Sequence, residues 1–276
     1  MSPALLGDPA EPTSVASTAG VPASAVHDTV VLPFNDVANS RRILEAQAGE
    51  LAAVIVEPMF GSAGMIPARP EYLAMLREVT RAHGMLLIFD EVVTLRVAPG
   101  GAQERYGILP DLTAMGKVIG GGLPVGAFGG REDVMALFDP TRGPRVAQAG
   151  TFTGNPVTMA AGVAAMEKLT PEVMRRVESL RDGLAQGIRD AAAEFDVPVQ
   201  VTGMGPFYAL HFTDRPVENY RDAASVDPDF KRQVFLGLMN EGILMASYMC
   251  GALSTPVTEA DVEAHVEALR RVLARA

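Results

Sequence analysis

Short apolar runs that alternate with amphipathic helical stretches are the feature of this sequence that most limits its fold. Two such runs, 52–56 and 85–89, flank a stretch beginning near Pro70 in which Leu73 and Leu76 fall on one helical stripe. Continuous apolar strands joined by amphipathic helices are typical of a mostly parallel sheet with helices on both faces. The sequence therefore predicts an α/β fold.

The C-terminal part of the chain has a different pattern. Helical spacing follows Thr170, a candidate cap, and a second capped helix is expected after Thr258, with Asp261 three positions later. Between these helices, 198–212 favours two strands with a turn, and a helix is expected around 230–241. We therefore expect the chain to have three segments. These are a loop-like or disordered 1–28, a sheet-forming large domain over 29–164, and a small α+β domain over 165–276.

Charge and cysteine content exclude several classes of protein. The 23 Lys and Arg against 33 Asp and Glu give a net charge of −10, which argues against nucleic acid or an anionic membrane as a partner. No run of apolar residues is long enough to span a membrane, and the N-terminus lacks the pattern of a secretory signal. Cys250 is the only cysteine, so we expect a packed thiol and a cytoplasmic protein.

Acidic side chains follow both predicted strands. Glu57 comes directly after the first run, and Asp90 and Glu91 come after the second. Because ligands gather at the carboxyl ends of parallel strands, these carboxylates are candidate site residues. The four histidines have no ligand spacing, so we predict no metal site and expect the histidines at surface positions.

Lys117 is one of three lysines and lies between small residues, just after a strand-like run. One interpretation is a buried amine, whose pKa burial would lower until it becomes a nucleophile toward an aldehyde. The other is a lysine whose stem lies along a strand end while its ammonium reaches water. The residues themselves leave both interpretations open.

A run of three glycines, Gly120–Gly122, follows Lys117. It fits neither the phosphate-binding loop of nucleotide hydrolases nor the dinucleotide fingerprint, so a tight backbone turn is favoured over a phosphate cradle. Taken alone, the run would still allow an unrelated α/β protein that binds a phosphate ligand.

Three motifs follow one another along the chain: Asp90–Val92, Gly116–Lys117 with Gly120–Gly126, and Gly150–Pro156. In this order they resemble consecutive signatures of the class III aminotransferases that depend on pyridoxal 5'-phosphate (PLP). Three further segments are Val56–Pro58, Gly101–Gly107 and Pro216–Tyr220. They are most similar to the glutamate-1-semialdehyde 2,1-aminomutase branch, and the resemblance runs from about residue 28 to the C-terminus.

The resemblance implies PLP-dependent transferase fold type I and assigns roles to single residues. Lys117 would be the Schiff-base lysine, Asp90 would pair with the pyridine nitrogen of PLP, and Val92 would pack on its ring. Thr151 would reach the cofactor phosphate of a neighbouring subunit, which implies a homodimer with shared active sites, and Glu57 would lie close to the substrate. The alternative for Thr151 is a capping hydroxyl before a helix that begins near residue 156.

The resemblance also implies an activity, which is amino-group transfer on a small amino or keto substrate, by an aminotransferase or an aminomutase. Met1 falls inside the family pattern, whose preceding N-terminal part carries the main loop for the PLP phosphate. The 29–164 segment is therefore expected to be a partial PLP-binding domain. The alternative function is a non-catalytic or split-enzyme fragment that needs a partner chain carrying the missing N-terminal half.

Overall fold

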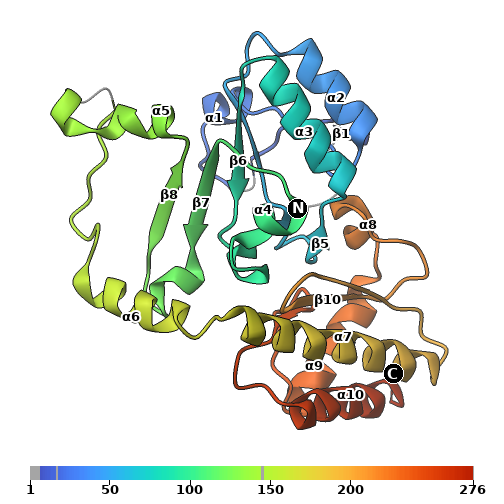
Figure 1. The fold of residues 1–276 in the computed structure, drawn as a ribbon. Coiled ribbons are helices and arrows are strands. Elements are labelled where there is room, and N and C mark those ends of the chain that lie inside the picture. The colour runs from blue at the N-terminus through green and yellow to red at the C-terminus, as the bar shows by residue number, and fades with distance from the viewer. Residues whose placement is uncertain (1–6, 17, 144–145, 276) are drawn as a thin grey trace.

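The computed structural model describes residues 7–16, 18–143 and 146–275 and has two parts, each built on its own sheet (Figure 1). The N-terminal part holds a four-stranded sheet in the order β3-β6-β7-β8. The first three strands run parallel, and β8 is antiparallel to β7. The strands are β3 (Ala53–Val56), β6 (Leu86–Asp90), β7 (Leu112–Gly116) and β8 (Gly126–Gly130).

Alternation along these strands places the main core on one face of the sheet. Val54 of β3 pairs with Leu87 of β6, and Val56 pairs with Phe89, so the four side chains share a face. There they pack in one core with residues of two helices, α2 (Val37–Ala46) and α3 (Pro70–Ala82). The expected strands and the helix that begins at Pro70 are confirmed.

The opposite face of this sheet carries the side chains that alternate with the core residues. On β8, Phe128 pairs with Ala114 and packs edge-on against Phe138, with ring centroids 5.2 Å apart. Phe138 ends the short helix η4 (Ala136–Phe138). Asp90 pairs with Ala114 from the other side, so it lies on this second face.

The C-terminal part packs long helices on an antiparallel sheet of order β11-β10-β9 (Figure 1). Its elements are α7 (Pro171–Ala193), β9 (Gln200–Thr202), β10 (Phe207–His211), α8 (Tyr220–Ala224), α9 (Pro228–Asn240), β11 (Cys250–Ala252) and α10 (Glu259–Leu273). The hydroxyl of Thr170 accepts a hydrogen bond from the Val173 N–H, and Thr258 and Asp261 form a capping box on α10. These predicted helix starts are confirmed. The domain boundary near residue 165 stays a prediction.

The first residues contain more regular structure than the sequence predicts. We expected a loop-like or disordered 1–28, but the structure has a short β1–β2 pair and a one-turn helix there, while residues 1–6 and 17 lie outside the described chain. The remaining short elements are β1 (Gly7–Asp8), β2 (Glu11–Pro12), α1 (Ala23–His27), β4 (Met59–Phe60), β5 (Ile66–Pro67), η2 (Thr94–Val97), α4 (Gly101–Tyr106), η3 (Lys117–Gly120), α5 (Glu132–Met135), η5 (Pro140–Arg142) and α6 (Pro156–Met166). Among the described helices, none is long and apolar enough to cross a membrane.

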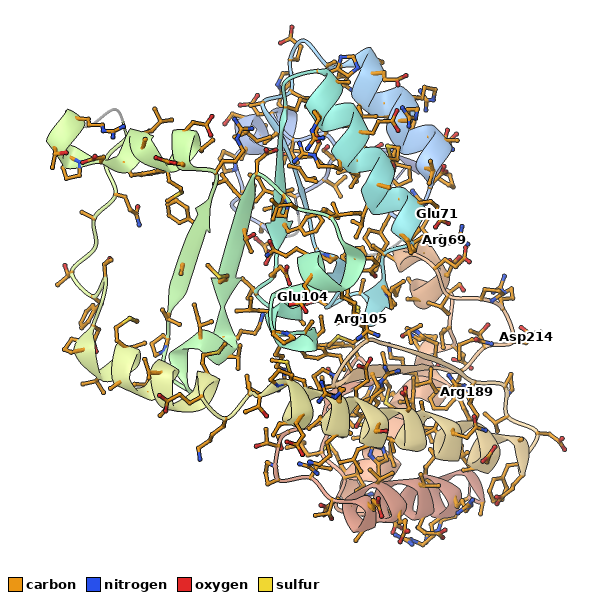
Figure 2. All side chains as sticks on the ribbon, in the orientation of Figure 1. Arg69, Glu71, Glu104, Arg105, Arg189 and Asp214 are labelled. Atoms are coloured by element: carbon orange, nitrogen blue, oxygen red, sulfur yellow. The ribbon has the colours of Figure 1, made fainter. Side chains whose placement is uncertain are left out.

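Polar contacts join the two parts. Arg69, at the start of α3, and Arg105, on α4, lie on the side that faces the C-terminal part, where they pair with Glu218 and Glu178 (Figure 2). The buried ring of His211 contacts the Gly64 carbonyl across the same junction, with Nε2 3.1 Å from the oxygen.

The expectation that the histidines are surface residues is therefore wrong for His211, and also for His265, which is 6% exposed. His211 lies on the central strand β10, where the Thr202 hydroxyl and the Gly64 carbonyl satisfy its ring nitrogen. Such partners lower the cost of burying a polar ring. Thr202 is 9 positions and Gly64 is 147 positions from His211 in the sequence. The residues next to His211 in the sequence therefore did not indicate these partners.

Candidate active site

Three of the predicted site residues lie at the carboxyl ends of neighbouring parallel strands. Val56 pairs with Phe89, so Glu57 is level with Asp90 just past the end of β3. Asp90 pairs with Ala114, and Lys117 comes one residue after β7. The charges of Asp90 and Lys117 both act on Glu57, which places all three groups in one electrostatic environment. The sequence predicted that Glu57 and Asp90 follow neighbouring strands, whereas the roles that the resemblance gives to the three residues stay predictions.

The two acids in succession, Asp90 and Glu91, point to opposite faces of the sheet. Asp90 Oδ1 accepts a hydrogen bond from the Val92 N–H at 3.0 Å, and Oδ2 has no partner among the described residues. The Glu91 carboxylate is fully buried and accepts from the backbone N–H groups of Ala102 and Gln103 at 2.6 and 3.0 Å. Glu91 therefore anchors α4, whereas Asp90 keeps an oxygen free for a ligand.

Glu57 is partly buried beside these groups. Burial raises the pKa of its carboxyl, and the negative charge of Asp90 raises it further. A hydrogen bond from the Gly61 N–H, 3.1 Å from Oε2, and the positive charge of Lys117 act in the opposite direction. Glu57 is thus a carboxyl that binds a proton more readily than an exposed glutamate does.

The Lys117 side chain is exposed, so the interpretation that expects a buried amine is wrong for this chain, and the lysine at a strand end is observed instead. Its backbone has φ of +49°, which is uncommon for a residue with a side chain and is often found at functional sites. The neighbouring Gly116 leaves room for Val92, whose methyl carbons would lie 3.4–3.5 Å from a side chain at position 116.

The glycine run after Lys117 forms a tight turn, as the sequence favoured. Gly121 and Gly122 have positive φ of +58° and +99°. This turn packs directly on α6, because a side chain at Gly121 would overlap the Ala161 carbonyl, and one at Gly162 would overlap the carbonyl of Ile119. Helix α6 therefore fixes the loop that carries Lys117.

Gly162→Ala is expected to lower the free energy of unfolding by about 1–3 kcal/mol, because the added methyl group forces α6 away from the Lys117 loop. Gly183→Ala is the matched control, since Gly183 is an exposed helical glycine on α7 with open space around it. That change should be neutral or stabilising by up to about 1 kcal/mol. Urea denaturation of both variants measures the difference, and equal midpoints would contradict the tight packing of α6.

Thr151 does not join the other site residues. It is exposed in a turn before α6, and in the described parts of the chain no hydrogen bond links it to Glu57, Asp90 or Lys117. The alternative role as a helix cap is wrong, because the side chain of Asn155 accepts the hydrogen bonds from Val157 and Thr158 at the start of α6.

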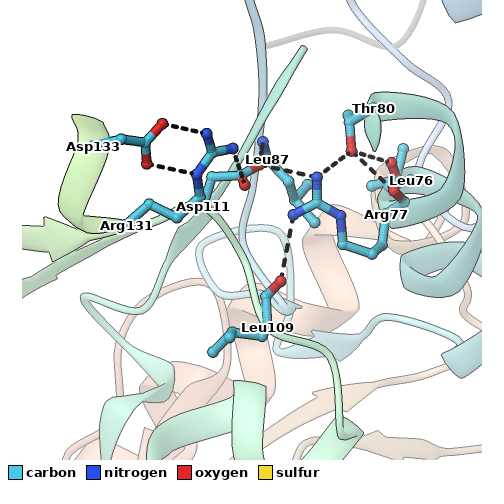
Figure 3. Close-up of polar contacts among 8 residues, drawn as sticks. All are labelled: Leu76, Arg77, Thr80, Leu87, Leu109, Asp111, Arg131 and Asp133. Carbon is cyan, nitrogen blue, oxygen red and sulfur yellow. Dashed lines mark hydrogen bonds and ion pairs between the residues drawn. The ribbon is translucent and has the colours of Figure 1, made fainter. Parts of the chain in front are cut away.

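Sequence reasoning missed the polar cluster at the other end of the same strands (Figure 3). Asp111 is 5% exposed and accepts hydrogen bonds from the Leu87 N–H at 2.7 Å and from Arg131 at 2.9 Å. It also forms an ion pair with Arg77 of α3 at 2.9 Å. This cluster ties β6, β7, β8 and α3 together. The only signal in the sequence was an acid just before an apolar strand, which is too common to single out.

The residues present fit two parts of PLP. The free oxygen of Asp90 can accept a hydrogen bond from a protonated ring nitrogen, and the exposed amine of Lys117 can reach an aldehyde. Val92 donates its backbone N–H to Asp90, and its side chain lies beside Gly116, the residue before Lys117. Across the described ranges, no group of three or more His, Cys, Asp or Glu side chains could hold a metal ion.

Comparison with known proteins identifies the family. The family model of aminotransferase class-III matches residues 9–273, so the chain belongs to the class III aminotransferases. These are PLP-dependent enzymes of fold type I, as the sequence motifs predicted. The weaker possibility of an unrelated phosphate-binding protein is thereby excluded.

Three relatives illustrate the similarity. The chain is 43% identical to a glutamate-1-semialdehyde 2,1-aminomutase of Brevibacillus brevis over 261 residues, which cover 93% of this chain and 60% of the relative. It is 43% identical over 249 residues to the beta-phenylalanine transaminase of Variovorax paradoxus, with coverage of 90% and 57%. The omega-transaminase of Sphaerobacter thermophilus superposes with a TM-score of 0.94 at 45% identity, covering 98% of this chain and 63% of that one. The chain thus spans about three fifths of the length of these relatives.

Proposed function

We propose that the chain acts in PLP-dependent amino-group transfer, with Lys117 as the residue that holds the cofactor covalently. The observation that carries this proposal is the meeting of Lys117 and Asp90 at adjacent strand ends, with one oxygen of Asp90 free. Membership of the class III family supports the same assignment.

When bound, PLP supplies an electron sink that eases the breaking of a bond at the amino-bearing carbon of a substrate. Asp90 would keep a proton on the ring nitrogen, since a carboxylate stabilises a neighbouring cation. The Lys117 amine would remove a proton at the reacting carbon and return one. Val92 would support the ring, and Glu57, whose pKa burial raises, would exchange a proton with a substrate group close by.

The substrate we propose is a small amino compound with a keto partner. One relative is named a glutamate-1-semialdehyde 2,1-aminomutase, and another is named a beta-phenylalanine transaminase. Transfer between two molecules and a shift within one molecule use the same residues up to proton return. An isotope label on the amino group of the substrate separates the two outcomes. The label moves to a second molecule in a transamination and stays in the same molecule in an aminomutase reaction.

Asp90→Asn tests the function. The wild-type chain is expected to transfer an isotope-labelled amino group from β-phenylalanine or glutamate to a 2-oxo acid, read by mass spectrometry. The variant should be about 10²–10³-fold slower, because an amide does not hold the ring-nitrogen proton. Glu50→Gln changes an exposed carboxylate that precedes β3, at the end of the strand opposite to Glu57, and this control should match wild type. Equal rates for Asp90→Asn and wild type would contradict the proposed role.

A homodimer with shared sites is part of the same proposal. Large apolar side chains are exposed along the turn before α6 and on α6 itself, including Phe152 at 81%, Val157 at 66% and Val163 at 58%. Exposed apolar patches of this kind mark protein interfaces. Thr151 lies in this segment, so a partner subunit that covers α6 would bring its cofactor phosphate to the Thr151 hydroxyl.

We infer a cytoplasmic location from the single cysteine. Cys250 lies buried on β11, and burial raises the pKa of its thiol to about 12. A thiol of this kind is a packing group rather than a reactive one, which suits a reducing compartment.

A second candidate function is a fragment that works only with a chain supplying the missing N-terminal half. The observation that favours it is a cavity of about 580 Å³ beside β3, lined by Val31, Leu44 and Ile55 among other residues. If this candidate is right, amino transfer appears only when the complementing polypeptide is added. No transfer with or without that polypeptide would contradict both candidates.

A further inference from the structure

The turn at residues 61–65, which joins β4 to β5, is the starting observation. The Gly61 carbonyl accepts hydrogen bonds from the N–H groups of Gly64 and Met65 at 3.2 and 3.0 Å, so the turn is closed on itself. At the first residue of the turn, the Gly61 N–H donates to Oε2 of Glu57 at 3.1 Å. The turn therefore carries the donor that fixes the Glu57 carboxyl.

The other end of the turn is held by the C-terminal part of the chain. The Gly64 carbonyl accepts a hydrogen bond from the Thr202 hydroxyl at 2.6 Å, and it lies 3.1 Å from Nε2 of His211. Nε2 is also 3.0 Å from the Thr202 hydroxyl oxygen. Thr202 lies on β9 and His211 on the neighbouring strand β10. We call this network of Thr202, His211 and the Gly64 carbonyl the junction clamp.

The backbone of the turn is fitted closely to the junction clamp. Gly64 has φ of +119°, and a side chain at this position would overlap Cε1 of the His211 ring. The next residue, Met65, has φ of +50°, which is unfavourable for a residue with a side chain. Strained backbone of this kind persists only where surrounding contacts fix it. The contacts from Thr202 and His211 supply part of that support.

His211 is a neutral donor in the junction clamp. The residue is 3% exposed, and burial lowers the pKa of its imidazole. The positive charge of Lys231 lowers this pKa further, whereas the hydrogen bond to the Gly64 carbonyl acts in the opposite direction. Because a carbonyl oxygen can only accept, Nε2 of His211 must carry the hydrogen. The ring therefore donates to the turn at neutral pH without placing a buried charge at the junction.

We propose that His211 and Thr202 are positioning residues for Glu57. They hold the Gly64 carbonyl, the closed turn passes that position on to Gly61, and the Gly61 N–H orients the Glu57 carboxyl. The C-terminal part thereby sets the geometry of a carboxyl at the strand ends of the N-terminal part. The contribution of Glu57 to the reaction rests on the proposed function, but its position does not.

The junction clamp also affects the proton affinity of Glu57. The hydrogen bond from the Gly61 N–H lowers the pKa of the Glu57 carboxyl against the larger effect of burial. A displaced turn loses this hydrogen bond, and the carboxyl then binds a proton more readily. Removal of either donor of the junction clamp should therefore raise the pKa of Glu57.

Two variants remove a donor and two others keep one. Thr202→Val replaces the hydroxyl by a methyl group of similar size, and His211→Leu removes the ring N–H. Thr202→Ser keeps the hydroxyl, and His211→Gln can place an amide N–H near the position of Nε2. The matched control is Thr80→Val, because the fully buried Thr80 hydroxyl donates to the Leu76 carbonyl at 2.7 Å within the polar cluster at the opposite end of the strands (Figure 3).

Hydrogen exchange followed by mass spectrometry reads the turn in the full chain without PLP. In Thr202→Val and His211→Leu, the peptide covering 58–66 should exchange about five- to tenfold faster than in wild type, because a hydrogen bond that opposes local opening is lost. Thr202→Ser and His211→Gln should exchange at close to the wild-type rate. Thr80→Val should leave this peptide unchanged, although it also loses a buried hydrogen bond. If His211→Leu does not fold, the pair Thr202→Val and Thr202→Ser decides.

The pKa of Glu57 is measured by NMR titration of its side-chain carboxyl, which is identified by the signal that Glu57→Gln lacks. We expect a higher pKa in Thr202→Val and His211→Leu than in wild type. The wild-type pKa should return in Thr202→Ser and His211→Gln. A general loss of stability would not follow this pattern, since it would not depend on the presence of a donor.

Three results would overturn the proposal. These are wild-type exchange of 58–66 in both donor-removing variants, equally fast exchange of 58–66 in Thr80→Val, and an unchanged pKa of Glu57 when the turn exchanges faster. None of these readouts uses amino transfer. If all are as expected but Glu57→Gln transfers amino groups at the wild-type rate, the junction clamp stands and the proposed role of Glu57 in the reaction fails.

Discussion

Lys117→Ala is expected to abolish the absorbance that PLP gains on binding to this chain. The signal depends on a covalent bond between PLP and an amine, and Lys117 is the lysine at the strand ends beside Asp90 and Glu57. The exposed position of Lys117 leaves the substitution little to disturb in the core. Titration of wild type and variant with PLP, followed from the near ultraviolet into the visible, makes the comparison.

The control for Lys117→Ala is Lys168→Ala. Lys168 is also exposed, but it follows helix α6 instead of a strand of the large sheet. It should keep the full signal. A variant at Lys117 that retains the wild-type absorbance would show that PLP is held by another amine, and the assignment of the site would then fail.

Asp111→Asn is expected to lower the free energy of unfolding by about 3–5 kcal/mol, because it removes the charge that compensates the largely buried Arg77. Chemical denaturation followed by circular dichroism measures the change. Asp133→Asn is the control: it also pairs with Arg131, but it is exposed and should change stability little (Figure 3). Similar losses in both variants would contradict the importance of the buried pair.

The same cluster predicts acid sensitivity. Burial alone would raise the pKa of Asp111, but hydrogen bonds from Arg77, the Leu87 N–H and Arg131 outweigh it and hold the pKa at about 2, below the usual 3.8. The folded chain therefore binds this proton less readily than the unfolded chain does. The stabilisation is complete above pH 3.8 and is lost as pH falls toward 2, which amounts to about 2–3 kcal/mol. In Asp111→Asn the stability should change less between pH 5 and pH 2 than in wild type.

Local patterns in the sequence predicted the strands, the long helices and their caps because these depend on neighbours within a few residues. The apolar runs around Val54 and Leu87 and the caps at Thr170 and Thr258 are of this kind. The position of Glu57 beside Asp90 was predictable as well, since consecutive parallel strands end at one edge of the sheet.

The remaining features depend on contacts between residues far apart in sequence. The exposure of Lys117 is determined by which segments cover the end of β7, and the burial of His211 by a carbonyl 147 residues away. Asp111 ties strands and helix together only because the fold brings Arg77 and the Leu87 N–H to its carboxylate, and the sequence does not show these contacts. Thr151 was assigned by resemblance alone, and its place relative to a cofactor involves a partner subunit.

The assignment of Lys117 as the cofactor lysine is tested most directly by trapping. The chain is mixed with PLP, treated with borohydride and digested, and mass spectrometry then locates the reduced PLP label. The chain has three lysines, Lys117, Lys168 and Lys231, so each can be scored separately. The account predicts label on Lys117 alone at low PLP concentration. Label on Lys168 or Lys231 to the same extent, or none on Lys117 even with the complementing polypeptide present, would contradict it.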